Sequence, residues 1–452
     1  MMHYQQVSTV QTDLPLNGDA DAHFELEEEK CKVYKKRWFM LFMFFAVSVS
    51  CIMNIMQYAI IADVIVKYYG VTYMAVNWSS TIYLLMYLVL GFPSTFILER
   101  WGLRVTTLMG MGFTTLGTWI KVGAVSPDRY WVLMLGQVII SISKVVVMPV
   151  PPKLAAVWFP AKEVSSACSI SVIGIQMGLA VGFLVPPFFF QSGAQGEDDI
   201  AGSLYRMNIS LAVVDTAILV VLLIFFKGAP PSPPSIAQSK IEKDKGFLEM
   251  AKIIVSNRTN IFLIISFGIV IGLLLTISTL LNQIILKHYH DGREDAGFIG
   301  LVMVLSGMVG TLSCGVILDR YGKFQQAALL LSILGACSML CYTFAIHKGI
   351  LLAYFITAIF GFSTLGMQVT GLELGAELTY PIPQGITAGI LMMSTQAFGI
   401  ALTYLYSQIF KAYGDFFANL TMFFIYVVEF ILMCTLKYNL RRRAIEKTRS
   451  LR

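Results

Sequence analysis

The stretch E-R-W-G at residues 99–102 returns as D-R-Y-G at residues 319–322, which is 220 residues later. Three other landmarks return at about the same distance: K-Y-Y at 67–69 as K-H-Y at 287–289, the A-A-V-W-F-P run at 155–160 as the weaker echo G-A-E-L-T-Y-P at 375–381, and Gln176 as Gln396. A single match is weak, but four landmarks in the same order and nearly in register indicate an internal duplication. The chain is therefore predicted to consist of two homologous halves.

Both halves contain apolar runs that are long enough to cross a membrane. The chain is 56% hydrophobic and 13% charged, whereas a soluble protein carries about 25% charged residues. About 20 apolar residues span the hydrocarbon of a bilayer. We predict an all-α membrane protein with twelve transmembrane helices in two pseudo-symmetric six-helix bundles, at residues 38–66, 74–98, 105–125, 130–152, 165–190, 207–227, 259–286, 296–318, 326–346, 350–372, 385–410 and 416–437.

The predicted organisation has five parts: an N-terminal tail (1–37), an N-terminal bundle (38–227), a linker (228–258), a C-terminal bundle (259–437) and a basic C-terminal tail (438–452). The tails, the linker and the loops on their side, together with the boundary residues Lys227 and Lys437, hold 24 of the 33 Lys and Arg residues. Basic residues favour the cytosolic side of a membrane. Both termini and the linker are therefore predicted to be cytosolic.

The linker begins with a proline-rich segment at 227–234, a composition that is extended and stiff. Residues 240–252 then alternate charged and apolar side chains, which predicts a short helix at the membrane surface. This segment is either a regulatory element or a plain connection between the halves, and its generic composition favours the connection.

The duplicated acidic–basic–aromatic–glycine element resembles the signature loop of the major facilitator superfamily. It lies between the second and third predicted helix of each half. In such a transporter the resemblance implies a gate, in which Glu99, Arg100, Asp319 and Arg320 pair across the halves in one state and separate in the other. Alternatively, the two arginines only anchor loops to lipid headgroups.

Two halves related by an axis along the membrane normal place a solute site near the midplane. Gln176 and Gln396 occupy corresponding apolar helices, and an amide in hydrocarbon needs hydrogen-bond partners. They are predicted to hold a polar solute from both sides, or else to bond helices within each half. The polar residues Asn54, Gln57 and Tyr58 on the first helix and Thr279 on the seventh either face the same path or serve helix packing.

Lys144 lies inside the fourth helix, where a cationic side chain is a functional hypothesis by default. It binds an anionic group of the solute, pairs with Glu373 or Glu377 on the tenth helix, or extends to the cytosol. Glu373 and Glu377 share a helix face and form a possible coupling or ion pair. Lys121, near the end of the third helix, is expected to extend to the membrane surface.

Several runs together resemble the feline leukaemia virus subgroup C receptor-related transporters: Y-G-V at 69–71, N-W at 77–78, A-V-W-F-P at 156–160, G-F-L-V-P-P at 182–187 and E-L-T-Y-P at 377–381. The resemblance covers about residues 37–440. It implies a plasma-membrane facilitator of choline, ethanolamine or haem, with other members in internal membranes, endolysosomal or mitochondrial.

The resemblance also implies a site, and this chain departs from it. The choline carriers of the family cage the quaternary ammonium with two aromatic residues, by cation–π attraction. Ile55 and Leu275 stand at these positions here, Lys144 replaces a glutamine, and Gln176 and Gln396 are retained. These changes favour haem or another organic anion. The alternative is a choline or ethanolamine carrier whose cage is rebuilt from Tyr58 or Tyr83.

Other classes fit the sequence less well. The duplication argues against a non-transporting receptor, and no nucleophile–base set indicates an enzyme. The seven cysteines are scattered, and the five histidines fall in predicted tails or loops, so no metal site or cofactor is expected. The expected partners are a small solute and the lipid bilayer, without nucleic acid, for a carrier that acts as a monomer. Few intramembrane carboxylates were identified, which favours facilitated diffusion.

Overall fold

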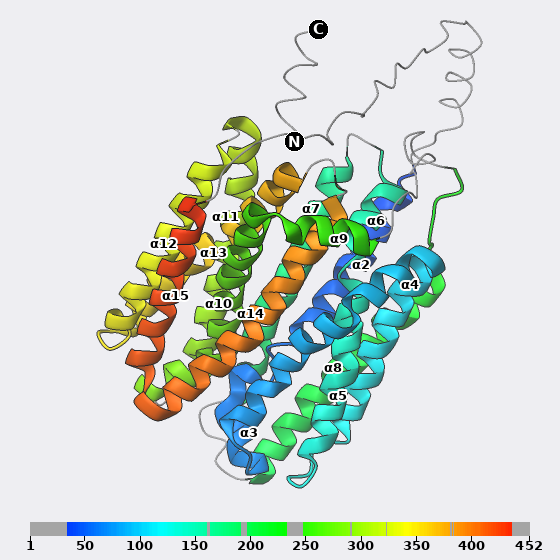
Figure 1. Cartoon of the computed structure of the whole chain (residues 1–452). Coiled ribbons are helices and arrows are strands. Elements are labelled where there is room, and N and C mark those ends of the chain that lie inside the picture. The colour runs from blue at the N-terminus through cyan, green and yellow to red at the C-terminus, as the bar shows by residue number, and fades with distance from the viewer. Residues whose placement is uncertain are drawn as a thin grey trace, which may run out of the picture.

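The computed structural model describes residues 34–160, 163–190, 197–232, 247–289, 292–321, 323–379, 382 and 384–435, and every regular element in these ranges is helical. The N-terminal half comprises α2 (Lys36–Met53), η1 (Ala59–Ile61), α3 (Ala62–Tyr69), α4 (Tyr73–Val122), α5 (Tyr130–Val147), α6 (Val150–Trp158), α7 (Val164–Phe189) and α8 (Glu197–Phe225). After α9 (Phe247–Ser256), the C-terminal half comprises α10 (Arg258–His288), α11 (Arg293–Tyr321), α12 (Phe324–Ala345), α13 (Ile350–Thr379), α14 (Gln384–Tyr413) and α15 (Asp415–Thr435) (Figure 1).

The twelve predicted crossings are present. Eleven helices in the described ranges are long and apolar enough to span a bilayer. The twelfth crossing is residues 103–122, because α4 is broken at Gly102, whose φ of 77° is a left-handed conformation that glycine adopts without strain. The glycine of the duplicated element therefore reverses the chain between the second and third crossings.

Two crossings of the N-terminal half are interrupted. The first unwinds at residues 54–58, between α2 and η1, and the fourth breaks at Pro149, between α5 and α6. Proline removes a helical hydrogen bond, which explains the second break.

One predicted boundary is wrong by about three turns, because α8 begins at Glu197 and not at residue 207.

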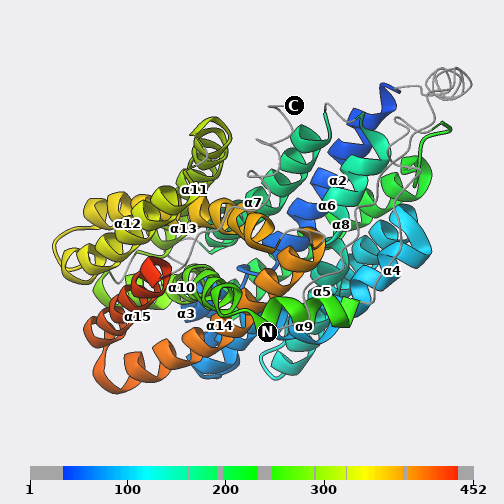
Figure 2. The same cartoon turned by 45° about the horizontal axis from the view of Figure 1, so that its top comes forward.

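The two halves lie side by side, as Figures 1 and 2 show by their blue-to-green and green-to-red ribbons. Within the N-terminal half, α4 packs on α5 and α8, and α2 packs on α7. Within the C-terminal half, α11 and α12 pack on α13, and α10 packs on α14. The halves meet where α7 lies against α11 and α4 against α14, so residues on these four helices border the interface.

Two tyrosine contacts recur in both halves and confirm the duplication at the level of hydrogen bonds. Each tyrosine hydroxyl donates to a backbone carbonyl at the corresponding turn or helix start: Tyr69 to Ala124 at 2.7 Å and Tyr289 to Ile346 at 2.8 Å, then Tyr130 to Ala75 at 2.7 Å and Tyr354 to Asp295 at 3.4 Å. Repeated local geometry of this kind requires a repeated fold.

The linker contains α9, which overlaps the predicted surface helix at its C-terminal end. α9 packs against α10 and α14. Residues 233–246, most of the N-terminal tail and the C-terminal tail from residue 436 lie outside the described residues, so the predictions for them remain predictions. We refer to the side that carries α9 and the Gly102 turn as the linker face, and to the other side as the opposite face.

Candidate solute site

The unwound segment 54–58 of the first crossing is stabilised by side chains from neighbouring helices. Ser80 donates to the carbonyl oxygen of Ile55 at 2.7 Å, and Gln137 donates to that of Asn54 at 3.3 Å. These bonds satisfy carbonyls that lost their helical partners, as membrane depth demands. The break thereby turns the Asn54 and Gln57 side chains toward the third and sixth crossings.

Lys121 lies at the centre of a polar network and does not extend to the membrane surface, so that prediction was wrong. Its side chain is fully buried, and its ammonium donates to Asn54 Oδ1 at 2.6 Å and Gln57 Oε1 at 2.5 Å. Asn208 donates to the Lys121 carbonyl at 3.0 Å and accepts from Gln57. Buried amides compensate the lost hydration of the ammonium. The polar atoms of Asn54 and Gln57 are thus engaged inside the N-terminal half.

The two tyrosines proposed to rebuild an aromatic cage are engaged in the same half. Tyr58 is fully buried, donates to Asn208 at 3.0 Å, and holds the Lys121 ammonium 5.1 Å from its ring centroid. Tyr83 is also fully buried and donates to Gln137 at 2.7 Å. A ring that already faces an ammonium is a poor cage for a second cation.

Gln176 and Gln396 share an unusual property. Gln176, on α7, donates across the halves to Thr311 at 3.3 Å, and Gln396, on α14, donates to Thr395 at 2.9 Å. Both side chains are more than nine-tenths buried. In each, the buried Oε1 atom accepts no hydrogen bond from any described residue. A buried acceptor without a donor is costly, so both oxygens are suited to a donor on a solute.

The remaining predicted contacts are apolar or weakly polar. Ile55 and Thr279 are buried. Leu275 is half-buried and lies against Gly399 of α14. A Cβ added at Gly399 would lie 3.2 Å from the Leu275 side chain. Neither Ile55 nor Leu275 offers a π-face, so an aromatic pair is missing from these two positions.

Lys144 is buried and isolated. Its side chain is 5% exposed, and it makes no hydrogen bond or ion pair with any residue that the structure describes. The pair with Glu373 or Glu377 is thus not formed in this conformation, and the side chain does not extend into water. Glu377 is buried and Glu373 is exposed, and both have other interactions.

The structure describes the side chains of only two of the four predicted gate residues, Arg100 and Arg320. Arg100 and Arg320 are both exposed, and Arg320 lies 5.7 Å from the ring centroid of its neighbour Tyr321. Neither arginine forms an ion pair with a carboxylate whose side chain the structure describes. The side chains of Glu99 and Asp319 lie outside what the structure describes, so the latch remains a prediction.

The opposite face, by contrast, is fastened between the halves. Arg293 of α11 forms an ion pair with Asp63 of α3 at 2.5 Å. Asn282 of α10 donates to the Ile60 carbonyl at 2.8 Å and to Asp63 at 3.1 Å. A second contact joins Gln283 to Asn77 at 2.6 Å. The sequence analysis missed the pair of Asp63 and Arg293, because nothing in the order of residues shows that positions 230 apart meet.

Two buried carboxyl groups were also missed. Asp215 of α8 accepts a hydrogen bond from Ser50, and Glu429 of α15 accepts from Ser266 at 2.9 Å and Ser332 at 3.1 Å. Both are at most 2% exposed. Each is a single acidic residue in an apolar run, which is the signal that should have found them. The chain therefore holds more intramembrane carboxylates than the sequence analysis expected.

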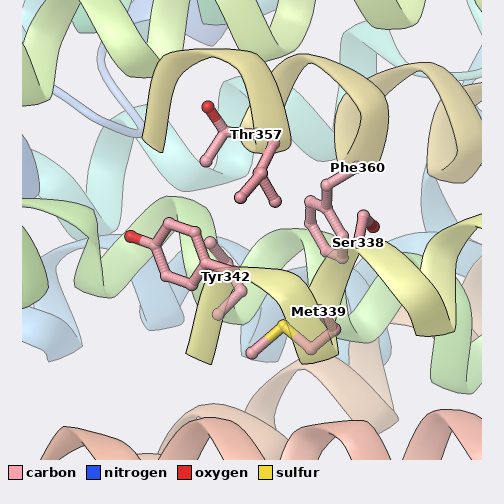
Figure 3. Close-up of a pocket in the computed structure, with 7 residues that line it drawn as sticks. Ser338, Met339, Tyr342, Thr357 and Phe360 are labelled. Carbon is pink, nitrogen blue, oxygen red and sulfur yellow. The ribbon is translucent and has the colours of Figure 1, made fainter. Parts of the chain in front are cut away.

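A small cavity inside the C-terminal half is not a solute site. Figure 3 shows Ser338, Met339 and Tyr342 of α12 facing Thr357 and Phe360 of α13 around it. Its volume is about 10 Å³, which is about the room that one water molecule needs. Small-molecule sites are far larger, at about 300–1,000 Å³.

Comparison with known proteins gives consistent relatives. The Major Facilitator Superfamily model matches residues 42–404. The chain is 37% identical to an uncharacterized MFS-type transporter of Caenorhabditis elegans, over 92% of this chain and 72% of that protein. It is 36% identical to the choline/ethanolamine transporter flvcr2a of Danio rerio (94% and 93% covered) and 35% identical to the choline/ethanolamine transporter FLVCR2 of Homo sapiens (92% and 80% covered).

Two solved structures share the fold at 12% sequence identity. A bacterial homologue of the human lysosomal transporter Spinster, in an inward-facing and unoccupied conformation, superposes with a TM-score of 0.68 over 90% of this chain and 98% of its own. The major facilitator transporter FucP in its outward conformation superposes with a TM-score of 0.61 over 90% and 99%. The twelve-helix, two-bundle architecture is therefore that of known membrane transporters.

Proposed function

Because the chain belongs to the major facilitator superfamily and, within it, to the feline leukaemia virus subgroup C receptor-related transporters, we propose that it carries a small organic solute with hydrogen-bond donors, of the ethanolamine and choline class. The observation that supports this most directly is the pair of buried Oε1 atoms of Gln176 and Gln396 that accept no hydrogen bond. Ethanolamine has donors at both ends, and choline has one hydroxyl donor. Two of the three relatives named above, those of Danio rerio and Homo sapiens, carry choline and ethanolamine in their names.

Ethanolamine fits the local chemistry better than choline does. A quaternary ammonium gains most of its binding from aromatic faces, and Ile55 and Leu275 provide none. A primary ammonium instead donates hydrogen bonds, which two amide oxygens accept well. We therefore infer that ethanolamine is preferred over choline at this site.

The second candidate is an organic anion such as haem, and Lys144 is the observation that favours it. An isolated ammonium at membrane depth is expensive unless a partner arrives. A carboxylate on the solute would be such a partner. No relative compared above is named for haem, which is why this candidate ranks second.

For transport we propose alternating access between two arrangements of the halves. In the present one, the Asp63–Arg293 pair and its neighbours hold the opposite face together. Opening that face requires these contacts to break while contacts on the linker face, including the predicted latch of Arg100 and Arg320, form. The solute would meet Gln176 and Gln396 between the two states.

The remaining expectations belong to the same proposal. We propose a monomeric carrier of the plasma membrane with cytosolic termini, the endolysosomal or mitochondrial membrane being the alternative. The basic tails and loops support this orientation. Facilitated diffusion remains the proposed driving mode. Uptake of the solute that persists after collapse of the proton and sodium gradients would support it.

The deciding experiment is uptake of labelled ethanolamine, choline and haem by cells that lack related carriers. We expect saturable ethanolamine uptake that falls at least tenfold in Gln176→Ala and Gln396→Ala. The matched variant Gln176→Glu keeps the size and adds a negative charge, so it should retain or improve ethanolamine uptake. Surface amounts of each variant are measured in parallel.

The same assay separates the two candidates. If Lys144 is only structural, Lys144→Gln leaves ethanolamine uptake within about twofold or raises it, since a neutral amide repels no cation. Haem uptake that is lost in both Lys144→Gln and Gln176→Glu would instead make the organic anion the substrate. Absence of all three fluxes, with the protein present at the surface, would refute the proposed substrate class.

A further inference from the structure

Three potential metal ligands meet on the opposite face of the C-terminal half. His288 ends α10, His347 lies in the turn between α12 and α13, and Asp415 begins α15. Figure 1 shows the turn after α12 and the start of α15 at the lower left, on the side away from α9. The sequence analysis assigned no metal site, because these residues are 59 to 127 positions apart and meet only in the folded chain.

The distances among the three groups are close to those of a metal site. His288 Nε2 lies 2.7 Å and His347 Nε2 lies 3.8 Å from the same Asp415 oxygen, Oδ2. All three candidate ligand atoms lie within 4.8 Å of one another. Ligands held about 2.1 Å from a tetrahedral Zn²⁺ lie about 3.4 Å apart. Changes of at most about 1.4 Å in these distances would therefore complete the geometry.

The surroundings orient the carboxylate. Asp415 is nearly buried, and its other oxygen, Oδ1, accepts from the Lys287 ammonium at 2.7 Å. This pair leaves Oδ2 directed at the two imidazoles. Hydrogen-bond partners commonly orient a ligating carboxylate in this way. The Lys287 charge opposes a cation, but this ammonium also lies 5.0 Å from the Phe410 ring centroid, which gives it a favourable contact besides Asp415.

We propose that His288, His347 and Asp415 form a binding site for a divalent transition-metal ion, with Zn²⁺ as the best match. Two imidazoles and one carboxylate are a common Zn²⁺ ligand set, and water completes the tetrahedron. The site ties the ends of α10 and α15 to the α12–α13 turn. Metal binding therefore stabilises the C-terminal half by mass action. Mg²⁺ and Ca²⁺ prefer all-oxygen sites and bind weakly here.

The test is Zn²⁺ binding to the purified full-length protein, isolated through a tag without histidine. Calorimetric titration is expected to show one saturable site whose affinity falls at least tenfold in His347→Ala. His347 is the residue of choice because its side chain is 47% exposed, and truncating it should leave the fold intact. Zn²⁺, but neither Mg²⁺ nor Ca²⁺, is expected to raise the thermal midpoint of the wild type.

Two controls make the result decisive. The variant Cys337→Ala/Cys341→Ala removes exposed thiols on α12 and should bind Zn²⁺ like the wild type. Co²⁺ bound at the site should show the visible spectrum of tetrahedral nitrogen and oxygen ligands without a thiolate band. Binding that survives in His288→Ala/His347→Ala, or that is lost in the cysteine variant, would overturn the proposal.

Discussion

The two halves share one architecture but treat buried charge differently. In the N-terminal half, the Asp215 carboxyl and the Lys121 ammonium attract each other without direct contact, and amides fill the space around the ammonium. In the C-terminal half, Glu429 has only the hydroxyls of Ser266 and Ser332, and no cation pairs with it in the described part of the chain. Each half keeps one acid inside the apolar part of its last helix, Asp215 on α8 and Glu429 on α15, but only the N-terminal half supplies a counter-charge to that acid.

This difference shows how a duplicated fold divides its roles. Removing one member of a buried charge system leaves the other uncompensated. Substitution of a charged residue in the N-terminal interior is therefore expected to destabilise the fold. A carboxyl group without a cation is costly to ionise in a low dielectric, so the C-terminal interior tolerates a neutral replacement. We therefore expect the N-terminal half to be the more rigid body during transport.

The largest effect is expected from Lys121→Met. The change leaves Asp215 without its counter-charge and strips the donor from Asn54 Oδ1 and Gln57 Oε1, at a cost of about 3–5 kcal/mol. The thermal midpoint of the purified protein, followed by size-exclusion chromatography after heating, should fall by more than 10 °C.

The control for this variant is Lys411→Met, an exposed lysine in the last turn of α14, which should be neutral. The double variant Lys121→Met/Asp215→Asn should recover part of the loss, since it removes both charges. A midpoint unchanged in Lys121→Met would mean that the network is not structural.

The second prediction compares the two acids directly. Asp215→Asn should cost about 1–3 kcal/mol, because it leaves Lys121 uncompensated. Glu429→Gln should cost less than about 1 kcal/mol, because the amide oxygen still accepts from Ser266 and Ser332. Both are measured by the same heating assay, and equal losses would erase the contrast between the halves.

A functional measurement sharpens the same pair. Uptake is recorded between pH 5.5 and 8 for the wild type, Glu429→Gln and Asp215→Asn. Facilitated diffusion predicts that Glu429→Gln keeps both the rate and the pH profile of the wild type. A pH dependence that disappears only in this variant would instead make Glu429 a proton-coupling group.

The third prediction concerns the contact that joins the halves. Arg293→Ala removes the ion pair with Asp63. The two side chains are 27% and 19% exposed, so the loss in the free energy of unfolding is expected to be about 0.5–1 kcal/mol. Hydrogen exchange of residues 59–69 should become several-fold faster as the opposite face opens more often. The charge-swapped variant Asp63→Arg/Arg293→Asp should restore slow exchange, and faster exchange in both would indicate a role beyond the pair.

The fold was predictable from the sequence because the 220-residue repeat and the long apolar runs can be read directly from the order of residues. Twelve crossings follow from length and hydropathy, and the break at Gly102 follows from the signature loop. The start of α8 was missed because its first turn carries acidic residues, which hydropathy assigns to a loop. Polarity alone could not show that α8 extends beyond the apolar core.

The candidate site was only partly predictable. Which residues line it depends on the direction in which each side chain leaves its helix, and polarity alone does not give that direction. Polarity at membrane depth identified Gln176, Gln396 and Lys144, which the structure places in buried positions without full partners. The same rule also selected Asn54 and Gln57, which turn toward Lys121 because the first crossing unwinds there. The unwinding has no clear sequence signal, and partners across helices cannot be read from spacing.

The smallest difference is expected where the halves repeat the same contact. Tyr69→Phe and Tyr289→Phe each remove one hydroxyl that donates to a turn carbonyl, at 2.7 and 2.8 Å. Each loss should cost about 1 kcal/mol, and the two thermal midpoints should agree within about 2 °C. If the costs diverge as much as those of Asp215→Asn and Glu429→Gln, one half is weaker throughout. If they agree, the divergence of the halves is confined to their buried charges, and the shared scaffold has remained equivalent.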